Sequence, residues 1–85
     1  MKTFDYTPKG VCSRSIHIEA DDNGVITSIR FVGGCMGNTQ GVARLAEGRK
    51  IDEVIEAVRG INCGMKGTSC PDQLAIALEK MKETL

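Results

Sequence analysis

Apolar and polar residues alternate along two stretches in the first third of the chain, which is the pattern of half-buried strands. In "SIHIEA", residues 15–20, three apolar residues share one face: Ile16, Ile18 and Ala20. In "VITSIRFV", residues 25–32, alternate positions again share a face: Val25, Thr27, Ile29 and Phe31. The Asn23-Gly24 pair between these stretches favours a tight hairpin turn. With "TFDY", residues 3–6, as a further strand, we expect a small antiparallel sheet.

After residue 35 the apolar spacing lengthens to the period of a helix. Helices are expected at residues 36–47, 52–59 and 71–84, the second with Asp52 as its N-cap. The first helix has an apolar stripe of Val42, Leu45 and Ala46, and the last has one of Leu74, Leu78, Met81 and Leu85. Strands followed by helices indicate a single α+β domain over residues 1–85, in which a hairpin and an N-terminal strand are packed by about three helices.

Length and charge exclude several classes of protein. A chain of 85 residues builds a core small enough to need a disulfide, a metal or an interface. Its 11 basic and 11 acidic residues cancel, and only 4% of residues are aromatic, so nucleic-acid binding is not expected. No apolar run approaches the ~20 residues of a membrane span, and "MKTFDYTPKG" has no apolar stretch of signal-peptide length. We therefore expect a cytoplasmic protein without membrane contact, whose thiols stay reduced.

Four cysteines lie at the expected junctions between elements: Cys12, Cys35, Cys63 and Cys70. Seven of the ten glycines fall within three residues of a cysteine: Gly10, Gly33, Gly34, Gly37, Gly60, Gly64 and Gly67. Glycine allows the close backbone approach that a loop around a thiolate or a metal needs. By contrast, His17 is expected on the solvent-facing side of its strand. Met36, Met65 and Met81 are expected to fill the core.

Pro71 is expected at the first position of the last helix, which makes Cys70 the N-cap residue. The unpaired N–H groups of the first helical turn would then face its sulfur. Cys35 is expected at a similar turn, after Gly33-Gly34. Such sulfurs suit a cation held by thiolates and equally a nucleophilic cysteine. The spacing of the cysteines is longer than in a zinc knuckle, so three readings stay open: a metal site, redox or nucleophilic thiols, and inert buried thiols.

The string "TSCPD", residues 68–72, resembles the TSCPD domain family. The likeness extends to "GGCMGNTQGVARLAEG" and "GINCGMKGTSCPDQLAIAL", and so covers nearly the whole chain. Members of that family occur as small free-standing proteins and as a region near the C-terminus of adenosylcobalamin-dependent ribonucleotide reductases. The resemblance implies a single TSCPD domain of the free-standing kind, linked to ribonucleotide reductase and deoxyribonucleotide synthesis.

The order of the cysteines also resembles iron–sulfur cluster scaffold proteins of the IscU and NifU type. Cys12, Cys35 in "RFVGGC" and Cys70 match the three scaffold cysteines, and "EGRKIDEV" is similar to a segment between them. This likeness implies an IscU-like fold with the cysteines gathered at one end. The chain departs from it at Arg14, where the scaffolds have an aspartate that helps cluster release, and at Ser69, where they have a histidine.

These observations lead to one leading hypothesis and two alternatives. Loss of the aspartate argues against cluster transfer, and a fourth thiol would close a coordination shell in the manner of structural zinc sites. We therefore expect a Zn²⁺-binding accessory or interaction domain, with a ribonucleotide reductase or another protein as partner. Its predicted ligands are Cys12, Cys35, Cys63 and Cys70. The first alternative is a scaffold-like or sulfur-carrying protein that holds an iron–sulfur cluster.

The second alternative is ribonucleoside-diphosphate reductase activity, which is not expected of this chain alone. Radical reduction of a ribonucleotide needs a large barrel, a radical generator and a nucleotide pocket, and 85 residues cannot enclose them. We therefore expect the chain not to be an enzyme by itself. It would assist such an enzyme by passing electrons through its thiols or by contacting the catalytic domain.

Overall fold

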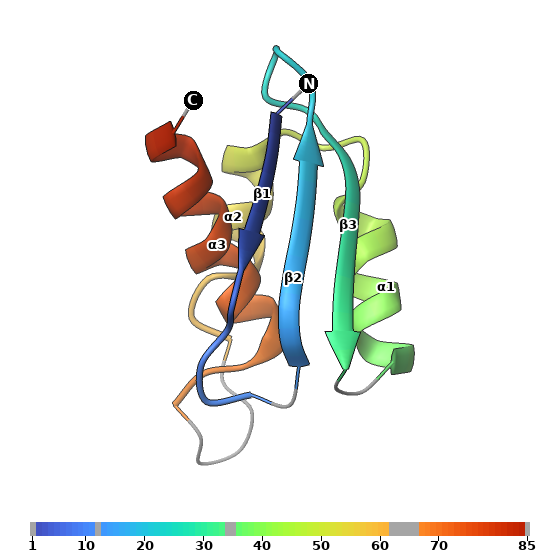
Figure 1. The fold of residues 1–85 in the computed structure, drawn as a ribbon, viewed down its shortest axis with the longest axis vertical. Helices are drawn as coiled ribbons and strands as arrows, with labels where there is room; N and C mark the ends of the chain where they lie inside the picture. Colours follow the sequence, from blue (N-terminus) through green and yellow to red (C-terminus); the bar gives the residue numbers. More distant parts are fainter. Residues whose placement is uncertain (1, 12, 34–35, 62–66, 85) are drawn as a thin grey trace.

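The computed structural model describes residues 2–11, 13–33, 36–61 and 67–84 of the chain (Figure 1). These residues form a three-stranded antiparallel sheet, ordered β1-β2-β3, and three helices. The strands are β1 (Lys2–Tyr6), β2 (Ser13–Ala20) and β3 (Ile26–Gly33). The helices are α1 (Met36–Ala46), α2 (Ile51–Val58) and α3 (Cys70–Thr84). The α+β class is confirmed, and each helix begins and ends within one residue of its expected position.

The hairpin between β2 and β3 is present, but its turn is longer than expected. The backbone N–H of Asp21 donates to the Val25 carbonyl at 2.9 Å, so three residues form the loop. The Asp21 carboxylate accepts the N–H groups of Asn23 and Val25 at 2.9 and 3.0 Å. Gly24 alone in the loop has positive φ, at 79°, whereas a two-residue type I′ turn needs positive φ at both positions. The side chain of Asp21 thus selects the three-residue loop.

Near this turn the pairing of β2 with β3 slips by one residue, and the slip decides which residues of β3 enter the core. Ala20 pairs with Ile26 instead of Thr27. Ile26 is fully buried and Thr27 is exposed. The prediction that Val25 and Thr27 share the buried face with Ile29 is therefore wrong for the first two. A bulge adds one residue to a strand and so reverses the alternation of its side chains.

All helices of the described chain lie on one face of the sheet, behind it in the view of Figure 1. Helix α1 packs along β3, α3 packs on β1 and β2, and α2 packs on α3. The fully buried residues between these layers include Ile16, Ile18, Leu74, Leu78 and Met81. The predicted stripe of the last helix is thus confirmed, apart from Leu85, which lies outside the described residues. No helix in the described part has the length and apolar run that crossing a membrane requires.

Helix α1 buries small side chains and leaves a large one in solvent. Thr39, Ala43 and Ala46 are buried, at 4%, 6% and 4% exposure, and their spacing of four and three residues places them on one side of the helix. Leu45 is 72% exposed, so its predicted place in the apolar stripe is wrong. Small residues on the buried side allow the helix to lie close to β3, and this packing turns Leu45 outward.

The start of α2 also differs from the expectation. Lys50 is the N-cap residue, and its backbone N–H donates to the Glu53 carboxylate at 3.1 Å. Asp52, the expected cap, lies inside the first turn. Its negative charge is still favourable there, because the N-terminus of a helix carries a partial positive charge.

Candidate functional site

Four elements have an end on the same side of the molecule, the lower end in Figure 1. There β2 begins, β3 ends, and α1 and α3 begin. Ser13 pairs with Gly33 across the sheet, and its hydroxyl lies 3.4 Å from the sulfur of Cys70. The predicted ligands Cys12, Cys35 and Cys63 lie outside the described residues. Cys70 is described, as a free and partly buried thiol.

Ser69, and not Cys70, caps the N-terminus of α3. The Ser69 hydroxyl accepts the backbone N–H of Asp72 at 3.2 Å, and its carbonyl accepts the N–H of Gln73 at 2.8 Å. This is the geometry of an N-cap residue, so the predicted cap at Cys70 is wrong by one position. A serine hydroxyl accepts hydrogen bonds better than a thiol does, which explains the choice. Cys70 therefore occupies the first position of the helix, with Pro71 second.

Thr68, Ser69 and Asp72 tie the segment that follows α2 to the start of α3. The Asp72 carboxylate accepts the backbone N–H of Gly60 at 2.7 Å and the Thr68 hydroxyl at 2.6 Å. The Ser69 hydroxyl donates to the carbonyl of Ile61 at 2.6 Å. These bonds hold both ends of the 60–68 segment on the helix.

Gln73 performs the same task for the segment after β1. It is 95% buried, and its side-chain oxygen accepts the Tyr6 hydroxyl at 3.2 Å and the Lys9 backbone N–H at 3.0 Å. Its amide nitrogen donates to the Thr68 hydroxyl at 2.9 Å. The buried side chain of Gln73 thus joins the segment that follows β1 to Thr68, which precedes α3. The sequence did not lead us to predict this role of Gln73. The signal that could have indicated it is the position of a glutamine next to Leu74, the first residue of the apolar stripe.

The hydrogen bonds around "TSCPD" leave the sulfur as the distinctive chemical group of the site. The polar side chains of Thr68, Ser69, Asp72 and Gln73 all bond to neighbouring segments. Cys70 contacts Ser13 and is partly exposed. Oxygen and nitrogen ligands near it are already engaged, so the described part of the site offers a soft sulfur donor. Such a donor suits Zn²⁺ or an iron–sulfur cluster.

Among the described residues no group of three or more His, Cys, Asp or Glu side chains is arranged to hold a metal ion. Since three of the four predicted ligands lie outside those residues, the cysteine site stays a prediction.

His17 lies on the face of the sheet opposite the helices. Its Nδ1 lies 2.6 Å from the Asp5 carboxylate, and its Nε2 lies 3.3 Å from that of Glu19. The hydrogen bond to Asp5, followed by that to Glu19, raises the pKa of His17 above its usual 6.5. The histidine is on the predicted polar face, yet its side chain is only 26% exposed because the two carboxylates flank it. Both ring nitrogens of His17 thus contact carboxylates of the sheet, and we assign the histidine a structural role there.

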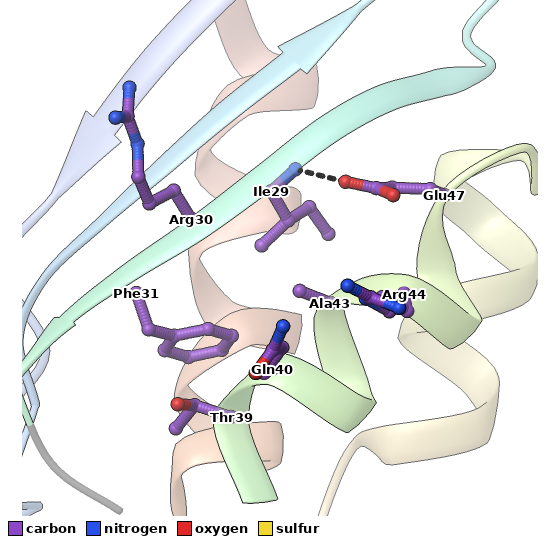
Figure 2. A pocket seen from close by; sticks show the side chains of 8 residues that line it. All are labelled: Ile29, Arg30, Phe31, Thr39, Gln40, Ala43, Arg44 and Glu47. Carbon is purple, nitrogen blue, oxygen red and sulfur yellow. Dashed lines mark hydrogen bonds between the residues drawn. The ribbon is translucent and has the colours of Figure 1, made fainter. Parts of the chain in front are cut away.

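A groove of about 420 Å³ runs between β3 and α1 (Figure 2). Ile29, Phe31 and Ala43 form its apolar wall, and the Glu47 carboxylate accepts the backbone N–H of Ile29 at 3.3 Å. β3 is an edge strand, so this bond covers a backbone group that would otherwise be open to pairing with another strand. Among the described residues that line the groove there is neither a histidine nor a cysteine, so we place the candidate site at Cys70 instead.

Comparison with known proteins identifies the family. No curated protein and no solved structure matches this chain. The family model of the TSCPD domain matches residues 1–82, which include all the described elements up to the last turn of α3. The match spans nearly all of the 85 residues, and the motif forms the N-terminal turn described above. The chain therefore belongs to the TSCPD domain family.

Proposed function

We propose that this TSCPD domain binds one Zn²⁺ ion through its four cysteine thiolates and acts as an accessory domain of a ribonucleotide reductase. The proposed ligands are Cys12, Cys35, Cys63 and Cys70. The observation that supports the proposal most is the contact between Ser13 and Cys70, because Ser13 directly follows Cys12 in the chain and pairs with Gly33, two residues before Cys35. A residue beside one proposed ligand thus contacts a second, and its strand partner lies two residues before a third.

The donor set fits zinc. Four thiolate sulfurs are a common ligand set of structural Zn²⁺ sites, and free energy of metal binding in such sites is also free energy of folding. A domain of 85 residues has a small core, here of mainly aliphatic side chains, and a bound metal ion would add to its free energy of unfolding. When bound, the ion would hold the segments around residues 12, 35 and 63 on the start of α3. Asp72 binds the backbone of Gly60 and Gln73 binds that of Lys9, and each of these two bound residues lies three positions before a proposed ligand.

The role beside a ribonucleotide reductase is proposed from the family. Two grooves among the described residues, one between β3 and α1 and one beside α2, are lined by ordinary surface and core side chains. An accessory domain needs a stable surface for its partner more than a reaction centre. A fold stabilised by a bound metal ion provides such a surface. We propose contact with the reductase protein itself, not with its nucleotide substrate.

Metal analysis tests the first part of this proposal. Protein purified under reducing conditions should contain one zinc per chain, and Cys70→Ser should lose most of it. Ser28→Ala, on the solvent-facing side of β3, is a matched control that should keep the metal. Absence of zinc from wild-type protein, with no binding on addition of Zn²⁺, would refute the metal site. Failure to co-purify with a ribonucleotide reductase from the same cell would refute the accessory role.

One observation favours an iron–sulfur alternative. Cys70 is partly exposed, and exposed thiolates suit a cluster that is delivered or exchanged better than a closed structural site. Anaerobic purification decides between the two. A brown protein with iron and acid-labile sulfide would support the cluster, and a colourless protein with zinc would support the first proposal.

A further inference from the structure

The hydroxyl of Ser13 is buried against a sulfur atom, which is a weak hydrogen-bond partner. It is 3% exposed, and among the described residues the sulfur of Cys70 is the hydrogen-bond partner of its hydroxyl, at 3.4 Å. A neutral thiol is a weak acceptor, whereas a thiolate accepts a charge-assisted hydrogen bond. Burying a hydroxyl against a poor acceptor costs free energy. A sulfur that binds a metal is a thiolate, and the Ser13 hydroxyl lies where it can donate a hydrogen bond to that ligand.

A β-bulge directs Ser13 toward Cys70. Ser13 pairs with Gly33, but Ser15 pairs with Val32, so Arg14 is an extra residue in β2. Strict alternation from the buried Ile16 would turn Ser13 away from the helices. The bulge reverses this, since Ser13 is buried and Arg14 is exposed. Bulges that redirect a single side chain are common beside functional sites.

Gly33 makes room for the bulge. It has φ of 79°, a conformation that other residues rarely adopt. A Cβ atom at this position would lie 3.3 Å from the Arg14 Nε atom and 3.6 Å from its backbone nitrogen. The bulge at Arg14 and the positive φ of Gly33 thus act together. They bring the Ser13 hydroxyl within hydrogen-bond distance of the Cys70 sulfur.

We propose that Ser13 is a positioning residue, which donates its O–H to the thiolate of Cys70 and so orients this ligand for the metal. This inference rests on the proposed function. Groups that hydrogen-bond to metal ligands orient them, and their loss typically lowers metal affinity about 10–100-fold. Ser13 supplies no bond to the metal; it fixes the direction of a sulfur that does.

The test compares Ser13→Thr with Ser13→Val in metal titrations. These variants have nearly the same shape, and only threonine keeps the hydroxyl. Titration with Co²⁺, in competition with a chelator, should give Ser13→Thr an affinity at least about tenfold higher than that of Ser13→Val. The sulfur-to-cobalt charge-transfer band should shift to longer wavelength in Ser13→Val, because a thiolate without its hydrogen bond gives up an electron more easily. Ser15→Ala removes a hydroxyl from the same strand and should leave affinity and band unchanged.

Two measurements keep this test separate from that of the metal site. If wild-type protein binds no Co²⁺ or Zn²⁺, the proposed function fails and Ser13 has no ligand to orient. If wild-type protein binds the metal but Ser13→Thr and Ser13→Val have equal affinity and the same band, Ser13 is not a positioning residue. Thermal unfolding of both metal-free variants should coincide, and an affinity difference matched by an equal stability difference in the metal-free proteins would also overturn the inference.

Discussion

The side-chain oxygen of Gln73 accepts the backbone N–H of Lys9 at 3.0 Å, although the two residues are 64 positions apart. The same oxygen accepts the Tyr6 hydroxyl. Through this buried amide, the first turn of α3 holds the segment that leads from β1 to Cys12. The placement of the proposed site therefore depends on a residue that does not itself bind a metal.

Replacement of Gln73 should destabilise the fold. Gln73→Leu keeps the size of the side chain but leaves the Lys9 N–H and the Tyr6 hydroxyl without this acceptor. Both bonds are part-buried, and a polar group left unpaired away from water costs about 1–3 kcal/mol. We expect a loss of about 2–4 kcal/mol in the free energy of unfolding, measured by urea denaturation. Gln40→Leu, at an exposed position of α1, is the control, and an equal loss there would contradict the role of Gln73.

The corrected cap of α3 predicts that Ser69 and Cys70 contribute differently to stability. Ser69→Ala removes the acceptor for the Asp72 N–H and the donor to Ile61, and should cost about 1–2 kcal/mol in metal-free protein. Cys70→Ser keeps both bonds and should change metal-free stability by less than about 0.5 kcal/mol. Chemical denaturation in the presence of a chelator measures both. A larger loss from Cys70→Ser would show that the thiol, and not Ser69, holds the start of the helix.

The ion pairs of His17 predict a pH dependence of stability. Hydrogen bonds to Asp5 and Glu19 raise the pKa of His17 in the folded state. The protonated ring thus stabilises the fold below its unfolded pKa of about 6.5, and the contribution is lost as the pH rises through the higher folded pKa. The free energy of unfolding, measured from pH 5.5 to 9, should fall more in wild-type protein than in His17→Gln. Parallel curves would contradict this.

Two leucines should differ sharply in their importance. Leu78 is fully buried and Leu45 is 72% exposed. Leu78→Ala should lower the free energy of unfolding by about 2–5 kcal/mol, because it removes buried contacts and leaves a cavity. Leu45→Ala should change it by less than about 0.5 kcal/mol. Urea denaturation of both variants makes the comparison, and a large loss at Leu45 would mean that another surface covers it.

The sequence predicts the elements of the fold well and the details of the site less well. Periodicity finds the buried faces of β2 and α3, because Ile16, Ile18, Leu74 and Leu78 repeat without interruption. It fails at Thr27, where a bulge changes the alternation. Bulges depend on the pairing of two strands, which the pattern of one strand does not contain.

Two misses at the site have similar physical causes. Pro71 favours Cys70 as the N-cap, but the hydroxyl of Ser69 competes for the same backbone N–H and accepts it. The role of Ser13 cannot be predicted from the sequence, since its hydroxyl reaches the Cys70 sulfur only because of the bulge opposite Gly33. The cysteines themselves are recognisable from their type and setting. The groups that orient them are ordinary serines and a glutamine, whose role depends on three-dimensional contacts.

X-ray absorption at the zinc edge tests the central claim, that four thiolates hold one metal ion. For protein purified with zinc under reducing conditions, the account predicts a first shell of four sulfur atoms at about 2.3 Å. In Cys70→Ser, the shell should contain three sulfurs and one lighter atom, or the metal should be lost. A wild-type shell made mainly of nitrogen and oxygen atoms at about 2.0–2.1 Å would contradict the claim.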